Sequence, residues 1–141
     1  MSKGGAMQEI TVRAELNQLD PVINFVETQL EEQHCSTQIR LQIEVCIEEM
    51  FVNVVNYAYG ENEGTATLRI ETQEDGIFGV ELIDSGMPFN PLNHEDPDIH
   101  LDADEREIGG LCILMVRKTM DVVEYRYENG ENHLVMKKAI R

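Results

Sequence analysis

The sequence predicts an α+β domain built as a two-layer sandwich, with helices packed on one face of a mostly antiparallel sheet. Two observations lead to this fold class. Apolar residues make up 42% of the 141 residues, so a single domain can bury a core large enough to fold unaided. The apolar periodicity follows the order strand, helix, helix, strand, strand, long loop, helix, strand, strand.

The amino-terminal part of the chain predicts one strand and then a helix. Three apolar residues alternate with polar ones, as they do in a short strand: Ile10, Val12 and Ala14. Asp20 is expected to cap the helix, with Pro21 in its first turn. Four apolar residues then form one helical face: Val22, Phe25, Val26 and Leu30.

A second, longer helix is expected from Ser36 or Thr37 to about Ala58, where Gly60 ends it. Asp75 and Gly76 are typical of a hairpin turn between two strands. The later elements are expected at Thr65–Thr72, Ile77–Ile83, a loop from Asp84 to Ile108, a helix from Gly109 to about Met120, and a closing hairpin of Val122–Tyr127 and His133–Lys138 around Glu128–Glu131. Residues 1–8 are expected to be a tag-like or disordered leader, and 9–141 a single domain.

The charge balance excludes several classes of partner. Eleven Lys and Arg residues against 27 Asp and Glu residues give a net charge of −16. Direct nucleic-acid binding and adsorption to anionic lipid both need clustered cations, so neither is expected. No apolar run reaches the roughly 18–20 residues that a membrane span needs.

The cysteines and histidines carry no metal or disulfide pattern. Cys35, Cys46 and Cys112 are an odd number without a CxxC pair, which indicates reduced core thiols and a cytoplasmic protein. The four histidines are scattered and none has HExxH spacing, so a zinc site is not expected.

Three polar side chains fall on one side of the second helix, namely Glu49, Asn53 and Asn56. Glu44 and Glu48 are expected on the opposite, wet face. The polar side chains face solvent or bond to nearby backbone in one interpretation. In the other they face a ligand, because a carboxylate and an amide oxygen can hold hydrated Mg²⁺ and activate a nucleophile.

Two further segments have the composition of a ligand site. Asp84 and Gly86 follow an apolar strand. In one interpretation the segment is a plain turn. In the other, the carboxylate accepts a hydrogen bond from an exocyclic amine of a ligand, and glycine lets a ring approach the backbone closely. Gly109 and Gly110 precede a helix. This glycine pair is either a structural connection or an anion-binding site formed by free backbone N–H groups at the start of the helix.

The order and spacing of these motifs resemble the nucleotide site of the GHKL (Bergerat) ATPase superfamily. The motifs are Glu-x-x-x-Asn on a helix, Asp-x-Gly-x-x-Phe-x-Pro after a strand, and Gly-Gly-Leu at a helix start. The short first strand, Tyr57-Ala58-Tyr59 and the Val116-Arg117-Lys118-x-Met120-Asp121 segment are most similar to the anti-sigma-factor serine/threonine kinases, the RsbW-like branch. The resemblance extends from about Glu9 and identifies 9–141 as a histidine-kinase-like ATPase domain.

The resemblance implies roles for individual residues. Glu49 would be the general base toward a protein serine, Asn53 would bind Mg²⁺ between the phosphates, and Asp84 would bind the adenine amino group beside Gly86. The loop from about Met87 to Ile108 would be the ATP lid, with Arg106 at its end near the terminal phosphate. The phosphate-binding helix would open with Gly109, Gly110, Leu111 and Cys112.

The resemblance also implies cofactors and partners. ATP and Mg²⁺ would be bound, a serine on a small STAS-type anti-sigma-factor antagonist would be phosphorylated, and a sigma factor would be sequestered in a partner-switching circuit. A homodimer is implied as well.

The chain departs from the family pattern at two positions. Cys112 replaces the second glycine of the family's G-x-G, and Tyr57 stands where histidine is frequent. Cys112 and seven acidic residues between Glu95 and Glu107 support an alternative function, a catalytically weak or inactive nucleotide-binding module that regulates by sequestering partners. A histidine-kinase ATPase domain is disfavoured, because no helical dimerisation segment with a phospho-acceptor histidine is recognisable.

Overall fold

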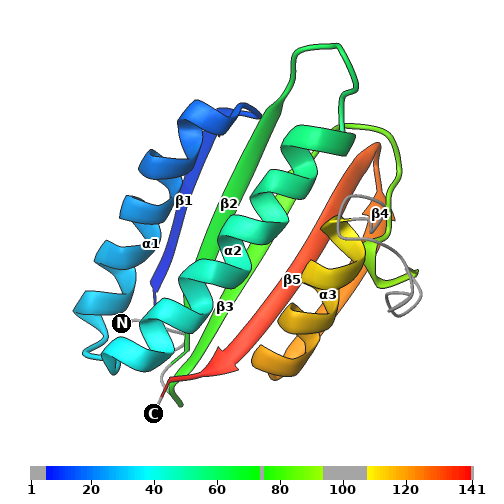
Figure 1. Ribbon diagram of the computed structural model, residues 1–141. Coiled ribbons are helices and arrows are strands. Elements are labelled where there is room, and N and C mark those ends of the chain that lie inside the picture. The colour runs from blue at the N-terminus through cyan, green and yellow to red at the C-terminus, as the bar shows by residue number, and fades with distance from the viewer. Residues whose placement is uncertain (1–5, 74, 94–107, 141) are drawn as a thin grey trace.

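The computed structural model describes residues 6–73, 75–93 and 108–140 (Figure 1). In chain order its elements are β1 (Ala6–Arg13), the 3₁₀-helix η1 (Leu16–Gln18), α1 (Leu19–Glu32), α2 (Thr37–Tyr57), β2 (Thr65–Thr72), β3 (Ile77–Asp84), the 3₁₀-helix η2 (Pro91–Asn93), α3 (Ile108–Thr119), β4 (Val122–Glu128) and β5 (Glu131–Ala139).

The strands form one antiparallel sheet in the order β1-β2-β3-β5-β4. All three α-helices lie on the same face of this sheet, and α2 lies between α1 and α3 (Figure 1). The structure therefore confirms the predicted fold class, with two layers and helices on one face.

The first strand begins earlier than the sequence pattern predicts. Ala6 pairs with Thr72 of β2, and the antiparallel register continues from there to Arg13. Residues 6–8 of the expected leader therefore belong to the sheet. Backbone hydrogen bonding to β2 extends the strand, and this pairing requires no apolar alternation in the side chains.

Helix α2 has the start and end that its sequence predicts. The Ser36 hydroxyl accepts a hydrogen bond from Ile39 N at 3.2 Å, which caps the helix. Ala58 follows the last helical residue, and Gly60 has a φ of 61°, a conformation that turns the chain away. Among the described residues, no helix combines the length and apolar character that crossing a bilayer requires.

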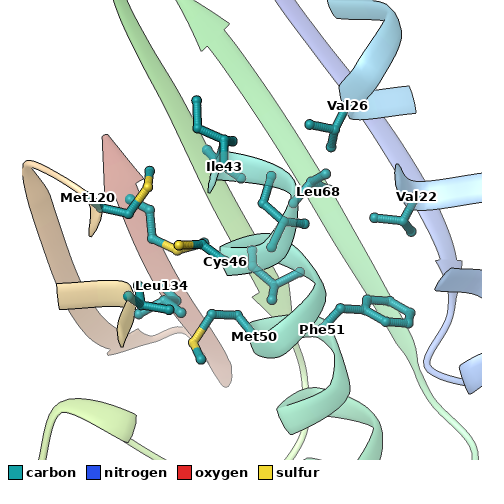
Figure 2. Packing of buried hydrophobic residues seen from close by; sticks show 14 of the residues in the cluster. Val22, Val26, Ile43, Cys46, Met50, Phe51, Leu68, Met120 and Leu134 are labelled. Atoms are coloured by element: carbon teal, nitrogen blue, oxygen red, sulfur yellow. The ribbon is translucent and has the colours of Figure 1, made fainter. Parts of the chain in front are cut away.

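The core lies between the helix layer and the sheet. Helix α2 contributes more buried apolar residues than any other element, because the helix is apolar over much of its circumference. Figure 2 shows α2 side chains beside residues of α1 and β2, and beside Met120 and Leu134. The largest fully buried side chains include Phe51, Phe78, Leu30, Ile43, Ile47, Met50, Leu68, Ile70 and Met136.

The expected capping role of Asp20 is wrong. The 3₁₀-helix η1 runs directly into α1, so Gln18 occupies the N-cap position and makes no side-chain capping bond. Asp20 lies in the first turn instead, where a carboxylate still interacts favourably with the positive end of the helix dipole.

The expected position of Glu44 on a wet face is also wrong. Glu44 is only 8% exposed, because α1 packs against this side of α2. Arg40 Nη1 contacts Glu44 Oε2 at 3.2 Å and Glu27 Oε2 of α1 at 2.6 Å. Burial raises the pKa of the Glu44 carboxyl, and the charge of Arg40 offsets this only in part. The triad joins α1 to α2 at a place where helical spacing alone predicts solvent.

Two of the three cysteines lie in the described side chains and both are free thiols. Cys46 is buried in the core, and burial raises the pKa of its thiol, so it stays neutral. Cys35 is only half-buried, beside the start of α2. Cys112 lies in α3, and its side chain is outside the described residues.

The closing hairpin is tighter than the sequence pattern predicts. Asn129 and Gly130 both have positive φ, 55° and 77°, which is the conformation of a two-residue turn. Strand β5 therefore begins at Glu131, ahead of the predicted start at His133. The earlier start places Asn132 within the sheet, opposite Asp84 of β3.

Candidate functional site

A pocket lies where the carboxy-terminal half of α2 meets the end of β3 and the start of β5. These ends and the start of α3 are on the same side of the molecule (Figure 1). The lining residues are Met50, Asn53, Val54, Tyr57, Ala58, Leu82, Asp84, Met87, Phe89, Pro91, Tyr125, Asn132 and Leu134. The cavity measures about 40 Å³, room for roughly three water molecules. Met87, 59% exposed, is the lining side chain most open to solvent.

Asn53 is the polar side chain that α2 contributes to this pocket. It is 5% exposed, and neither Oδ1 nor Nδ2 has a hydrogen-bond partner among the described residues. Leaving a buried amide unsatisfied costs about 1–3 kcal/mol. An amide kept in this state on a pocket wall is typical of a side chain that faces a ligand.

The neighbouring polar residues of α2 are placed differently. Glu49, one helical turn before Asn53, is half-buried, whereas Glu48 and Asn56 are exposed. Glu48 is thus on the wet face, as predicted. The polar stripe therefore divides: Asn53 lines the pocket, Glu49 lies on the helix leading to it, and Asn56 faces solvent.

Asp84 lines the pocket on the side of the sheet. It is the last residue of β3 and is 7% exposed. Its Oδ1 accepts hydrogen bonds from Gly86 N and from Asn132 Nδ2, both at 2.9 Å. These two donors fix the carboxylate against the end of the sheet, so a ligand in the pocket meets a carboxylate of set orientation.

The structure gives a packing reason for glycine at position 86. A Cβ atom on Gly86 would lie 2.2 Å from the carbonyl oxygen of Ala58, at the end of α2. The same oxygen accepts a hydrogen bond from Met87 N at 2.8 Å. Glycine is therefore required because the end of the helix packs against the backbone at this position.

Replacing Gly86 by alanine is expected to destabilise the fold by about 2–3 kcal/mol, because the Cβ would meet backbone atoms that cannot move aside cheaply. For a chain of this size we expect the melting temperature to fall by roughly 5–10 °C. Gly79→Ala is the matched control, since its Cβ would meet nothing closer than 3.5 Å. Equal melting temperatures for the two variants would contradict the prediction.

Two tyrosines fix the loop that follows β3. The Tyr59 hydroxyl donates to Thr65 O at 2.5 Å and accepts from Ser85 N at 2.8 Å. The Tyr57 ring stacks on Phe89, with ring centroids 5.5 Å apart. The loop therefore leaves the sheet along a fixed path beside the carboxy-terminal turn of α2.

Asn132 is the pocket residue that the sequence interpretation missed. It is 5% exposed and bonds to Asp84, to Met87 O at 2.9 Å and to Phe89 N at 3.1 Å. The Tyr125 hydroxyl of β4 also bonds to its Oδ1. One sequence signal points to it: Asn132 is in phase with the buried residues Leu134 and Met136, so it is an amide on the core side of a strand.

The glycine pair lies where the sequence places it, at a helix start. Helix α3 begins at Ile108, so Gly109, Gly110, Leu111 and Cys112 fall in its first turns. The side chains of 108–112 and the whole of Arg106 lie outside the described residues, as does the segment 94–107 of the expected lid. Arg117 Nη2 donates to Leu92 O at 2.6 Å and ties α3 to η2 beside the pocket.

Comparison with known proteins agrees with this arrangement. The profile of the histidine kinase-like ATPase domain family matches residues 12–138. The chain belongs to this family. The match covers every element that lines the pocket.

Curated relatives of this histidine kinase-like ATPase domain are protein kinases. The serine/threonine-protein kinase BtrW of Bordetella bronchiseptica is 25% identical over 104 residues, which cover 72% of this chain and 71% of that protein. The serine-protein kinase RsbW of Listeria monocytogenes is 29% identical over 103 residues, which cover 70% of this chain and 64% of that protein.

A solved structure has the same fold. The crystal structure of the RsbU and RsbW domains of a Mycobacterium tuberculosis protein matches 96% of this chain with a TM-score of 0.70, at 15% identity. The matched part is 32% of that longer chain. The chain thus has the RsbW-like ATPase fold that its motifs predict.

Proposed function

We propose that the chain is an ATP-binding anti-sigma regulatory factor with protein serine/threonine kinase activity. The observation that carries the proposal is the convergence of Asn53 and Asp84, from different elements, on one largely apolar pocket. A buried carboxylate and an unsatisfied amide suit an amino-purine with a charged tail. Relatives that are named as serine or serine/threonine protein kinases support the proposed kinase activity.

Asn53 fits the Mg²⁺ that accompanies ATP. Mg²⁺ prefers oxygen ligands and keeps several of its waters, so a protein contributes few of them. The Asn53 Oδ1 is a buried amide oxygen without a partner among the described residues, which suits such a ligand. When bound, the ion would neutralise charge on the phosphates, a contribution common to phosphoryl-transfer enzymes.

Glu49 is proposed as the general base. Its carboxylate would accept the proton of a serine hydroxyl on the protein substrate while the serine oxygen bonds to the γ-phosphorus and ADP leaves. Glu49 lies one turn before Asn53 on α2, so the proposed base and the proposed Mg²⁺ ligand would share one helix. The proposed phosphate-binding site is the first turn of α3, which contains Gly109 and Gly110. Arg106 is proposed to interact with the terminal phosphate.

The proposed partners follow from the same family membership. The serine would lie on a STAS-type anti-sigma-factor antagonist, and the chain would also sequester a sigma factor as a cytoplasmic homodimer. With a net charge of −16, the chain would meet a basic face on the sigma factor, so their binding should weaken with salt.

The experiment that tests the proposal is thermal melting with ADP and ATP, with and without Mg²⁺. A nucleotide at about 100 times its dissociation constant adds roughly 2.7 kcal/mol of stability, which is a shift on the order of 5–10 °C for a domain of this size. We expect such a shift, larger with Mg²⁺ for ATP. No shift with any nucleotide would contradict the proposal.

Phosphoryl transfer is then measured with radiolabelled ATP and purified STAS-domain proteins of the same cell, with phosphoserine located by mass spectrometry. We expect a single labelled serine. Nucleotide binding without transfer to any of these proteins would favour the alternative, a nucleotide-binding module that acts by sequestration.

A further inference from the structure

The amide of Asn132 is saturated with hydrogen bonds. Its Nδ2 donates to Asp84 Oδ1 and to Met87 O, each at 2.9 Å. Its Oδ1 accepts from Phe89 N at 3.1 Å and from the Tyr125 hydroxyl. An asparagine side chain has two N–H donors and two acceptor positions, so all four are used.

This bonding pattern fixes which way the amide faces. A flipped amide would place its oxygen against the Asp84 carboxylate and the Met87 carbonyl, and its NH₂ group against the Phe89 N–H. Each of these contacts would be repulsive. Asn132 therefore presents only donors to Asp84.

The orientation of Asp84 follows from that of Asn132. Gly86 N and Asn132 Nδ2 both donate to Oδ1, and no hydrogen bond from the described residues reaches Oδ2. Oδ2 is therefore the carboxylate oxygen that is left to accept a hydrogen bond from a ligand in the pocket. Met87 and Phe89, both held by Asn132, line the same pocket.

We propose that Asn132 is a positioning residue for base selection: it holds the Asp84 carboxylate in one orientation, and so makes the pocket prefer a base with an exocyclic amine over one with a carbonyl at that point. The inference rests on the proposed nucleotide binding and deepens it. Asn132 acts through Asp84 and through the loop backbone that it holds. Adenine satisfies an oriented acceptor, whereas hypoxanthine presents a carbonyl oxygen to it.

The other titratable groups around this amide support its role. The Tyr125 hydroxyl faces it from β4, and burial raises the pKa of that hydroxyl, so Tyr125 remains a donor. Asp84 faces it from β3, and Tyr57 lines the pocket from α2. Glu131 and His133 are the neighbouring residues of β5, where alternation directs them to the other face of the sheet.

The test compares ADP with inosine diphosphate (IDP) by calorimetry between pH 6 and pH 8, in wild type, Asn132→Asp and Asn132→Ala. In Asn132→Asp two carboxyl groups lie within hydrogen-bond distance and must share a proton. We expect ADP affinity to fall by at least about tenfold at pH 8 and to recover toward pH 6, because the protonated carboxyl group can again donate to Asp84. Asn24→Asp, an exposed change of the same kind on α1, is the control.

Asn132→Ala removes the donor without adding charge. We expect it to lower the ADP-over-IDP preference by about tenfold at every pH, because the Asp84 carboxylate loses an orienting donor and can then rotate. If Asn132→Asp does not fold, the ratio of ADP to IDP affinity in Asn132→Ala tests the proposal on its own.

Two results would overturn the inference, and they differ. Wild-type preference in Asn132→Ala, with no pH-dependent deficit in Asn132→Asp, would mean that Asn132 is structural while nucleotide binding stands. Failure of wild type to bind ADP would overturn the proposed function as well.

Discussion

Glu49→Gln is expected to lower the rate of serine phosphorylation by 10²–10⁴-fold, the usual contribution of a general base. Glutamine keeps the size of the side chain and its place on α2, but it cannot accept the proton of the attacking hydroxyl. Because Glu49 does not line the pocket, ADP should still stabilise the variant. The measurement is the initial rate of phosphoserine formation at saturating ATP, beside an ADP melting shift.

Glu48→Gln is the matched control for this variant. The two glutamates are adjacent on α2, but Glu48 is exposed and Glu49 is half-buried. We expect the control to phosphorylate at the wild-type rate. A Glu49→Gln protein that transfers phosphate as fast as this control would exclude Glu49 as the base.

Asp84→Asn is expected to weaken ADP binding by at least about a hundredfold and to reverse the preference between ADP and IDP. The amide oxygen can still accept from Gly86 N and Asn132 Nδ2, so the fold should survive. The NH₂ group would then occupy the Oδ2 position, facing the amine of adenine donor to donor. A site built to bond one partner rejects the mismatched one strongly, because buried polar groups are left unpaired.

Binding of ADP and IDP by calorimetry measures this reversal. Asp20→Asn, on the exposed first turn of α1, removes the same charge away from the pocket and should bind as wild type does. Unchanged ADP affinity in Asp84→Asn would show that Asp84 does not contact the base.

The features that depend on contiguous residues could be predicted from the sequence. The Ser36 cap and the β2–β3 hairpin turn are set by neighbouring residues, and both are found as predicted. The separate motifs of Asn53 and Asp84 could also be found, because helical spacing and strand ends are visible in the chain. Their convergence on one pocket follows from the antiparallel sheet with α2 above it.

The features that depend on register or packing could not be predicted. Asn132 acquires its role because β5 pairs with β3 so that it lies opposite Asp84, and a two-residue difference in the strand start conceals this. Glu44 is buried because α1 supplies Glu27 beside the shared Arg40. Glycine is required at position 86 because the backbone there packs against Ala58 at the end of α2, a contact between residues far apart in the sequence.

The packing of Gly86 on Ala58 has a mechanical consequence. Met87 N bonds to the Ala58 carbonyl, and the Tyr59 hydroxyl bridges Thr65 and Ser85. Ala58 and Tyr59, the two residues after α2, are thereby attached to the start of β2 and to the loop after β3. Because these contacts hold the end of α2 against the end of β3, they oppose any change in the spacing between Asp84 and the proposed base on α2.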